Sequence, residues 1–125
     1  MDSISDLLTR IRNAAAVQKS DVNVSYSKMN ETILGIFKRE GFLDSIEVTD
    51  EDNRKQINIK ISDKKAPSHI AQISKPGRRI YVKSKEMPKP LRGLGIVVVS
   101  TSTGIVTGRE AAKKGLGGEV ICEIW

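Results

Sequence analysis

The spacing of the apolar residues changes along this chain of 125 residues, and the change restricts the folds that it can adopt. Between residues 4 and 15 apolar side chains recur every three or four positions, which is typical of an amphipathic helix. Between residues 57 and 61 they recur at every second position, which is typical of a strand with one buried face. Helical and strand periods in separate segments predict an α+β fold.

The first half of the chain alternates between helical and strand patterns. Ser3 with Asp6 has the spacing of a helix N-cap pair, and Ser27 is suited to cap a second helix that ends at Gly41. The expected buried face of this second helix consists of Met29, Ile33, Ile36 and Phe37. The predicted elements are a helix over 3–17, a strand over 21–26, a helix between 27 and 41, and strands over 45–49 and 55–62. Together they predict an α-β-α-β-β lobe over residues 1–62.

The second half begins with a segment that resembles a linker. Residues 63–69, Asp-Lys-Lys-Ala-Pro-Ser-His, are polar and charged, and Pro67 interrupts them. Thr107 and Glu110 have the spacing of a capping box and predict a short helix through about Lys114. The remaining patterns predict strands over 70–74, 78–83, 94–101, 104–107 and 119–125. The sequence therefore predicts two small lobes packed together. The second lobe, over residues 70–125, is mostly β and contains a short helix.

Positive charge is concentrated in the second half of the chain. The formal net charge is +6, with 9 Lys/Arg and 10 Asp/Glu in residues 1–62 against 12 and 5 in residues 63–125. Such an asymmetry is expected of a surface that binds a polyanion such as nucleic acid. It is equally expected of a solvated basic surface, so charge alone leaves both interpretations open.

Composition excludes several classes of protein. The single cysteine excludes an internal disulfide framework and a zinc site built from cysteines. No apolar run reaches the roughly 18 residues of a membrane span, and the acidic N-terminus lacks the basic start of a signal peptide. The glycine-rich stretches precede strands rather than helices, so no nucleotide-binding loop is predicted. We expect a cytosolic protein without a metal, a cofactor, a small-molecule substrate or a membrane partner.

The residues that commonly carry catalysis do not form a recognisable site. His69 is the only histidine, and a hydrolase would need it beside Ser100 or Ser102. The sequence lacks the strand-serine-helix turn of such hydrolases, and Cys122 lies in a strand pattern that predicts a buried, inert thiol. The protein is predicted not to be an enzyme, with a hydrolase that uses a hydroxyl of residues 100–103 as the alternative.

Four short hydroxyl side chains and a glycine, Ser-Thr-Ser-Thr-Gly at residues 100–104, separate two apolar strand patterns; we call this segment the hydroxyl turn. Short hydroxyls can hydrogen-bond to RNA 2′-hydroxyls and base edges, and a glycine lets the backbone approach a shallow groove. The chain has one Trp, two Tyr and two Phe, too few to favour a platform on which bases stack. An ordinary hairpin with Ser/Thr turn chemistry is the alternative.

Nearly the whole chain resembles one known family. The stretch STSTGIVTGREAAKKGLGGEVICEIW is similar to the C-terminal signature of the eighth small-subunit ribosomal protein of bacteria. The blocks ISKPGRRIYVK and LRGLGIVVVSTS are also family-like, and DLLTRIRNA and SKMNETILGIFKREGF resemble the family's N-terminal helices. The chain departs from the family pattern at Val106, at Gly108 and in VSYSK, which lacks a common proline; none of these lies in the hydroxyl turn.

The resemblance implies a two-lobe protein that binds the central domain of small-subunit ribosomal RNA and represses its own operon through an mRNA site resembling that RNA. Carried over to this chain, the RNA-contacting residues of the C-terminal lobe are Ser100, Thr101, Ser102 and Gly104, with Tyr81, Gly118 and Glu119 nearby. On the N-terminal lobe, the residues implied to contact a second RNA helix are Arg12, Asn13 and Lys28.

The same resemblance implies where the protein resides and what surrounds it. Neighbouring small-subunit ribosomal proteins are expected partners, and the expected location is a ribosome of the cytoplasm or of an organelle. A free-standing RNA regulator is the other interpretation, and co-sedimentation with small subunits distinguishes the two.

Overall fold

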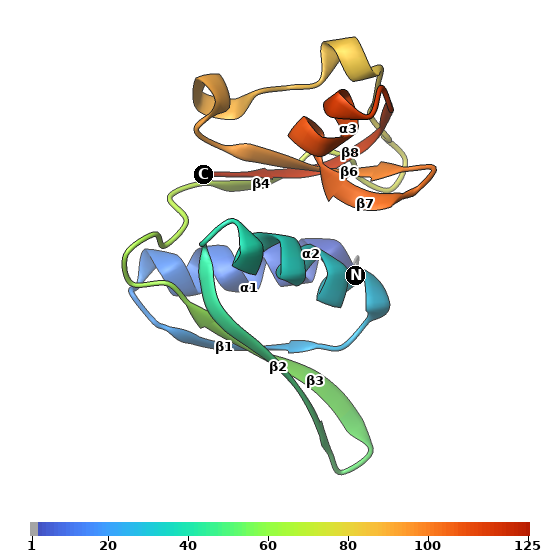
Figure 1. Cartoon of the computed structure of the whole chain (residues 1–125). Coiled ribbons are helices and arrows are strands. Elements are labelled where there is room, and N and C mark those ends of the chain that lie inside the picture. The colour runs from blue at the N-terminus through green and yellow to red at the C-terminus, as the bar shows by residue number, and fades with distance from the viewer. Residues whose placement is uncertain (1–2) are drawn as a thin grey trace. The chain divides into compact units, whose positions relative to one another are not determined.

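A computed structural model describes residues 3–125 (Figure 1). The chain divides into two compact units, the first ending at Ser68 and the second comprising His69–Trp125. The linker over residues 63–69 remains a prediction. Within this segment, Lys65 Nζ donates a hydrogen bond to the Glu40 carbonyl at 2.7 Å and lies over the Phe42 ring.

The first unit has the predicted α-β-α-β-β order. Its elements are α1 (Ser3–Ala16), β1 (Asp21–Ser25), α2 (Lys28–Arg39), β2 (Leu43–Glu51) and β3 (Arg54–Ile61). The prediction that Ser27 caps α2 is confirmed, since its hydroxyl accepts a hydrogen bond from the Asn30 amide at 3.0 Å. Strand β2 is longer than predicted, because only Asp52 and Asn53 form the turn and both adopt the left-handed conformation that a two-residue hairpin requires.

The strands of the first unit form an antiparallel sheet in the order β1-β3-β2, and both helices lie on one of its faces (Figure 1). The period-two prediction is confirmed, since Ile57, Ile59 and Ile61 are buried. The prediction that Met29 is buried is wrong, because its side chain is 37% exposed. Asn30 takes the buried position in the first turn of α2 and donates a hydrogen bond to the Ser25 carbonyl, so Met29 lies at the margin of the buried stripe.

The second unit is mostly β with a short helix, as predicted. Its elements are β4 (Ile70–Gln72), β5 (Tyr81–Val82), the 3-10 turns η1 (Ser84–Glu86) and η2 (Pro90–Gly93), β6 (Ile96–Thr101), β7 (Gly104–Thr107), α3 (Gly108–Lys113) and β8 (Gly118–Ile124). The sheet has the order β4-β8-β6-β7, and β5 also pairs with β8. The predicted strand over 78–83 is only two residues long, because Lys75 and Arg78 close a turn and the Ile80 amide donates to the Ser74 hydroxyl.

Helix α3 and the core of the second unit hold β6 and β8 in place. The Thr107 hydroxyl accepts a hydrogen bond from the Glu110 amide at 3.2 Å, which confirms the predicted cap. The buried core on the face covered by α3 consists of Met87, Val97, Val99, Ala111 and Val120. Val97 and Val99 occupy alternate positions of β6. Val98 and Ser100 therefore point to the opposite face of the sheet.

Candidate nucleic-acid interface

Three of the predicted contact residues lie in one row across neighbouring strands. Tyr81 of β5 is opposite Glu119 of β8, and Glu119 is in turn opposite Ser100 of β6. Ile105 of β7 continues the row as the partner of Ser100. Directly opposed residues of antiparallel strands point to the same face, so four strands bring these side chains together. The row ends beside the hydroxyl turn, which connects β6 to β7.

The threonines of the hydroxyl turn hydrogen-bond to each other and to the turn's backbone. The Thr101 hydroxyl donates to the Gly104 carbonyl at 2.8 Å and accepts from the Thr103 amide at 3.2 Å. The two threonine hydroxyl oxygens are themselves 3.2 Å apart. The Thr101 hydroxyl therefore shapes the turn.

Ser102 stands apart from this internal network. Its side chain is exposed at the tip of the turn, and within residues 3–125 no hydrogen bond engages its hydroxyl. Gly104, also exposed, has a φ of +131°, a backbone conformation that residues other than glycine rarely adopt. The tip thus presents one uncommitted hydroxyl and an uncovered backbone.

Gly118 has a packing role that the sequence did not reveal. A Cβ atom at this position would overlap the carbonyl oxygen of Ser100 and meet the Val99 side chain at 3.0 Å. The absence of a side chain therefore lets β8 approach β6 directly beneath the hydroxyl turn. This close approach places Glu119 beside Ser100 in the row.

Glu119 forms an ion pair with a residue outside the predicted site. Its carboxylate accepts a hydrogen bond from Arg79 Nη1 at 3.2 Å, and its side chain is 19% exposed. This pair compensates the one negative charge in the row. Tyr81, the β5 member of the row, is 70% exposed, so an aromatic ring and the Arg79 guanidinium lie at the β5 end of the row.

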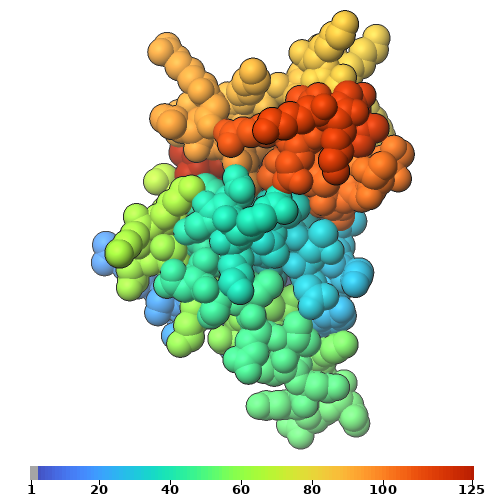
Figure 2. Space-filling view, in the orientation of Figure 1, coloured from blue at the N-terminus to red at the C-terminus, as the bar shows by residue number. Residues whose placement is uncertain are grey.

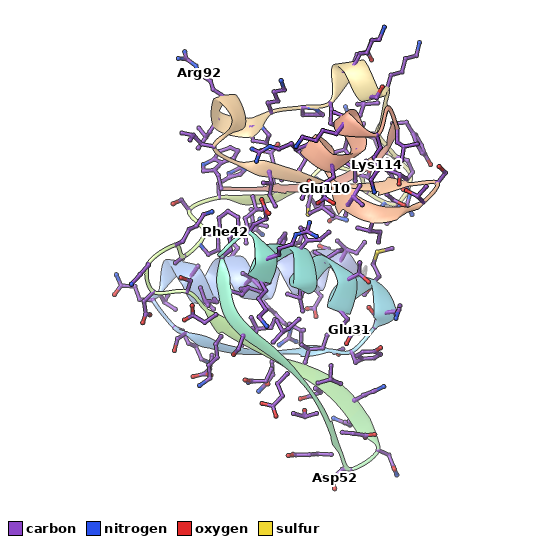
Figure 3. All side chains as sticks on the ribbon, in the orientation of Figure 1. Glu31, Phe42, Asp52, Arg92, Glu110 and Lys114 are labelled. Carbon is purple, nitrogen blue, oxygen red and sulfur yellow. The ribbon has the colours of Figure 1, made fainter. Side chains whose placement is uncertain are left out.

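The second unit carries many exposed lysine and arginine side chains. The exposed basic residues of the unit are Lys75, Arg78, Arg79, Lys83, Lys85, Lys89, Arg92, Arg109, Lys113 and Lys114. Figure 3 shows Arg92 and Lys114 on different segments of the unit. The acidic residues number four in His69–Trp125, namely Glu86, Glu110, Glu119 and Glu123, so the unit is strongly basic.

The predicted contacts of the first unit lie on its two helices. Arg12 and Asn13 are exposed on α1, and the guanidinium of Arg12 donates a hydrogen bond to the Thr9 hydroxyl at 3.4 Å. Lys28 is exposed and is the first residue of α2. Exposed cationic and amide side chains at these positions are suited to phosphate and ribose contacts.

His69 has a structural arrangement that sequence reasoning missed. Its ring stacks on Trp125 with centroids 3.8 Å apart, and its Nε2 lies 2.9 Å from a Glu123 carboxylate oxygen. The backbones of His69 and Trp125 also exchange two hydrogen bonds, each of 3.0 Å. His69 therefore binds Trp125 through both its backbone and its ring, next to the pairing of β4 with β8. Only the pairing of β4 with β8, which places His69 opposite Trp125, could have indicated this contact.

Cys122 is fully buried, and burial raises the pKa of its thiol from 9.0 to about 12, with a smaller contribution from the Glu123 carboxylate. Since the reactive form of cysteine is the thiolate, the native thiol is inert, as predicted.

The raised pKa of Cys122 makes stability depend on pH in a defined window. The unfolded chain releases the thiol proton near pH 9 and the folded chain only near pH 12. The contribution of the protonated thiol to the free energy of unfolding is therefore complete below pH 9 and decreases as the pH rises from 9 toward 12. Above pH 9 we expect the free energy of unfolding to fall more steeply than in Cys122→Ala, with the difference in slope approaching about 1 kcal/mol per pH unit. Urea unfolding between pH 8 and 10.5 checks this, and equal slopes would contradict it.

Two other kinds of site have no counterpart in the described part of the chain. Among residues 3–125, no group of three or more His, Cys, Asp or Glu side chains is arranged to hold a metal ion. No helix within these residues is both long and apolar enough to span a membrane.

Comparison with known proteins identifies close relatives along the full chain. The family model described as ribosomal protein S8 matches residues 2–125. The small ribosomal subunit protein uS8 of Thermus thermophilus is 46% identical over 135 residues, which cover 99% of this chain and 98% of the relative. The uS8 protein of Natranaerobius thermophilus is 44% identical, covering 99% and 97%. A protein named uS8c from Tetradesmus obliquus is 43% identical, covering 99% and 98%.

Proposed function

Because the chain belongs to the ribosomal protein S8 family, we propose that it binds the central domain of small-subunit ribosomal RNA through the hydroxyl turn and the row beside it. As a member of this family it is a structural protein of the small ribosomal subunit and not an enzyme. The hydrolase alternative is therefore set aside.

The observation that carries this proposal is the exposed Ser102 hydroxyl at the tip of a turn that Thr101 holds in shape. A serine hydroxyl both donates and accepts, so it can pair with a ribose 2′-hydroxyl or with a base edge. Without a side chain at Gly104, the backbone of the tip can approach the floor of a shallow minor groove.

The rest of the row supplies different kinds of contact. Tyr81 offers an exposed ring against which a single base or ribose can pack. Arg79 is oriented by Glu119 and can bind a phosphate without leaving that carboxylate uncompensated. Other exposed lysines and arginines of the second unit can bind RNA phosphates, but such contacts carry no sequence information.

The first unit adds a second RNA contact in this proposal. Arg12, Asn13 and Lys28 bind the backbone of another RNA helix through phosphate and ribose groups. We further propose that an mRNA segment with the shape of the ribosomal site occupies the same surface, which would let the protein repress its own operon. The organisms of the relatives support a ribosome of the bacterial cytoplasm or of a chloroplast.

A salt titration tests the proposed specificity. Filter binding to a central-domain fragment is expected to weaken with salt, with a log-log slope of about −0.7 to −0.9 per phosphate contact. The preference for this fragment over a generic RNA duplex of equal length is expected to persist at high salt, because the hydroxyl contacts are not ionic. Equal affinity for the two RNAs at every salt concentration would contradict a specific site.

A further inference from the structure

Strand β2 forms one edge of the first unit's sheet, and its outer side has no partner strand. The sheet order is β1-β3-β2, so β2 pairs only with β3. Within residues 3–125, no backbone hydrogen bond from any other segment reaches residues 44–51. A free edge of this length can accept another strand, because its unpaired N–H and C=O groups form a ready template.

The alternation of hydrogen bonds along the ladder determines which groups of β2 face outward. The hairpin closes through a two-residue turn, Asp52-Asn53, with Glu51 opposite Arg54. Such a turn closes on a pair that exchanges both hydrogen bonds, and every second pair along the ladder does the same. The residues between these pairs direct their N–H and C=O groups away from β3: they are Ile46, Val48 and Asp50.

The neighbouring strand provides an independent check of this assignment. Lys55 is the partner of Asp50, and its carbonyl accepts a hydrogen bond from the Tyr26 amide at 3.1 Å, on the β1 side of β3. Lys55 therefore directs its backbone away from β2. In an antiparallel pair this requires Asp50 to direct its own backbone away from β3.

The outer side of β2 is accessible. Val48 is 39% exposed, although its face of the sheet is the one that the helices cover. Figure 2 shows the surface of the β2–β3 hairpin, in green, extending as a projection, and Figure 3 places Asp52 at its far end. The hairpin thus reaches beyond the part of the sheet that α1 and α2 cover (Figure 1).

The charge of β2 indicates what kind of strand can pair with it. The strand carries Asp44, Glu47, Asp50 and Glu51 and no lysine or arginine, in a chain whose net charge is +6. Lys55 and Arg54 lie opposite Asp50 and Glu51, whereas Asp44 and Glu47 have no basic residue directly opposite. The carboxylates of Asp44 and Glu47 therefore repel RNA phosphates. A second copy of β2 would align the same carboxylates against each other, which is also unfavourable. A basic segment is the complementary partner.

We propose that the outer edge of β2 binds an extended, basic segment of another protein, which joins the sheet as a fourth strand. Glu47 and Glu51 lie on the open face of the sheet, and Ile46 and Val48 on the helix-covered face. The preferred segment therefore alternates lysine or arginine with small apolar residues. This proposal concerns the first unit and does not depend on RNA binding by the hydroxyl turn, so each can fail without the other.

Amide hydrogen exchange of the full chain tests the proposal, with an octapeptide of alternating lysine and valine as the probe. At a peptide concentration ten times the dissociation constant, exchange of the Ile46, Val48 and Asp50 amides is expected to slow by about tenfold. The Asn23 amide is the internal control. Asn23 is opposite Asn58, whose backbone groups face β2, so its amide also points outward but at the opposite edge of the sheet.

Matched variants separate backbone pairing from simple charge attraction. Val48→Pro removes one outward N–H without breaking the ladder to β3 and is expected to weaken peptide binding severalfold, whereas Val48→Ala keeps the N–H and binds like the parent. The double variant Glu47→Gln and Glu51→Gln is expected to weaken binding of the lysine peptide but not of a serine-valine peptide. This double variant keeps the proposal testable even where the proline variant does not fold.

Several outcomes would overturn the proposal. These are equal protection of Asn23, equal binding of a glutamate-valine peptide, protection of the same amides by a generic oligoribonucleotide, or dimerisation of the chain through β2 without peptide. Protection confined to the three outward amides of β2, dependent on lysine and lost in Val48→Pro, supports it.

Discussion

Gly118→Ala is expected to destabilise the protein by about 2–4 kcal/mol, although it adds a single methyl group. The added Cβ would overlap the Ser100 carbonyl oxygen, and backbone atoms cannot rotate away as a side chain can. Strand β8 must therefore separate from β6, which disrupts the pairs Val99–Val120 and Ser100–Glu119. The free energy of unfolding from urea titration measures the effect.

The same substitution in α2 is the matched control. Gly35 lies within the helix, and a Cβ there would meet no atom within 4 Å. Gly35→Ala is expected to stabilise the protein by about 0.5–1 kcal/mol, because alanine favours the helix and restricts the unfolded chain. A Gly118→Ala protein within about 0.5 kcal/mol of the parent would show that β8 does not depend on this close approach.

Gly104→Val is expected to weaken binding of the central-domain RNA by more than about tenfold, the largest loss from any single change in the hydroxyl turn. The φ of +131° is nearly confined to glycine, so valine must change the backbone of the turn. No atom lies within 4 Å of the added Cβ, so the protein's own packing does not oppose the change. The expected loss of fold stability is about 1–3 kcal/mol, from backbone strain alone.

Two measurements separate the effects of Gly104→Val on folding and on binding. Thermal unfolding gives the temperature range in which the variant is fully folded, and filter binding is then performed within that range. Gly115→Val is the control, because Gly115 also has a positive φ of +69° but lies after α3, outside the hydroxyl turn. Unchanged affinity in the folded Gly104→Val protein would mean that the RNA does not approach this backbone.

Local signals in the sequence predicted the elements well. The caps at Ser27 and Thr107 depend on a hydrogen bond to an amide three residues away, so the sequence contains all the information that they need. The period-two burial of residues 57–61 is equally local. The error at Met29 arose because Asn30, a polar residue, is buried through a hydrogen bond to the preceding strand.

The contacts that define the candidate site depend on strand register, which local patterns do not specify. The Arg79–Glu119 ion pair joins residues 40 positions apart, and the His69–Glu123 contact spans 54 positions. The packing of Gly118 against Ser100 likewise exists only because β6 pairs with β8. The sequence identified Ser100, Tyr81 and Glu119 through a family resemblance, and pairing of the strands explains why they lie together.

We propose that the hydroxyl turn, rather than positive charge, provides specificity for RNA. The most direct measurement is the ratio of dissociation constants for a generic duplex and the central-domain fragment, in Ser102→Ala and in Lys113→Ala. Lys113 is exposed on α3, so its loss is expected to weaken both RNAs alike or neither and to leave the ratio unchanged. Ser102→Ala is expected to leave fold stability within about 0.5 kcal/mol and to weaken only the cognate fragment, by about 1–3 kcal/mol. A Ser102→Ala ratio equal to that of the parent, in a protein that is still folded, would contradict the claim.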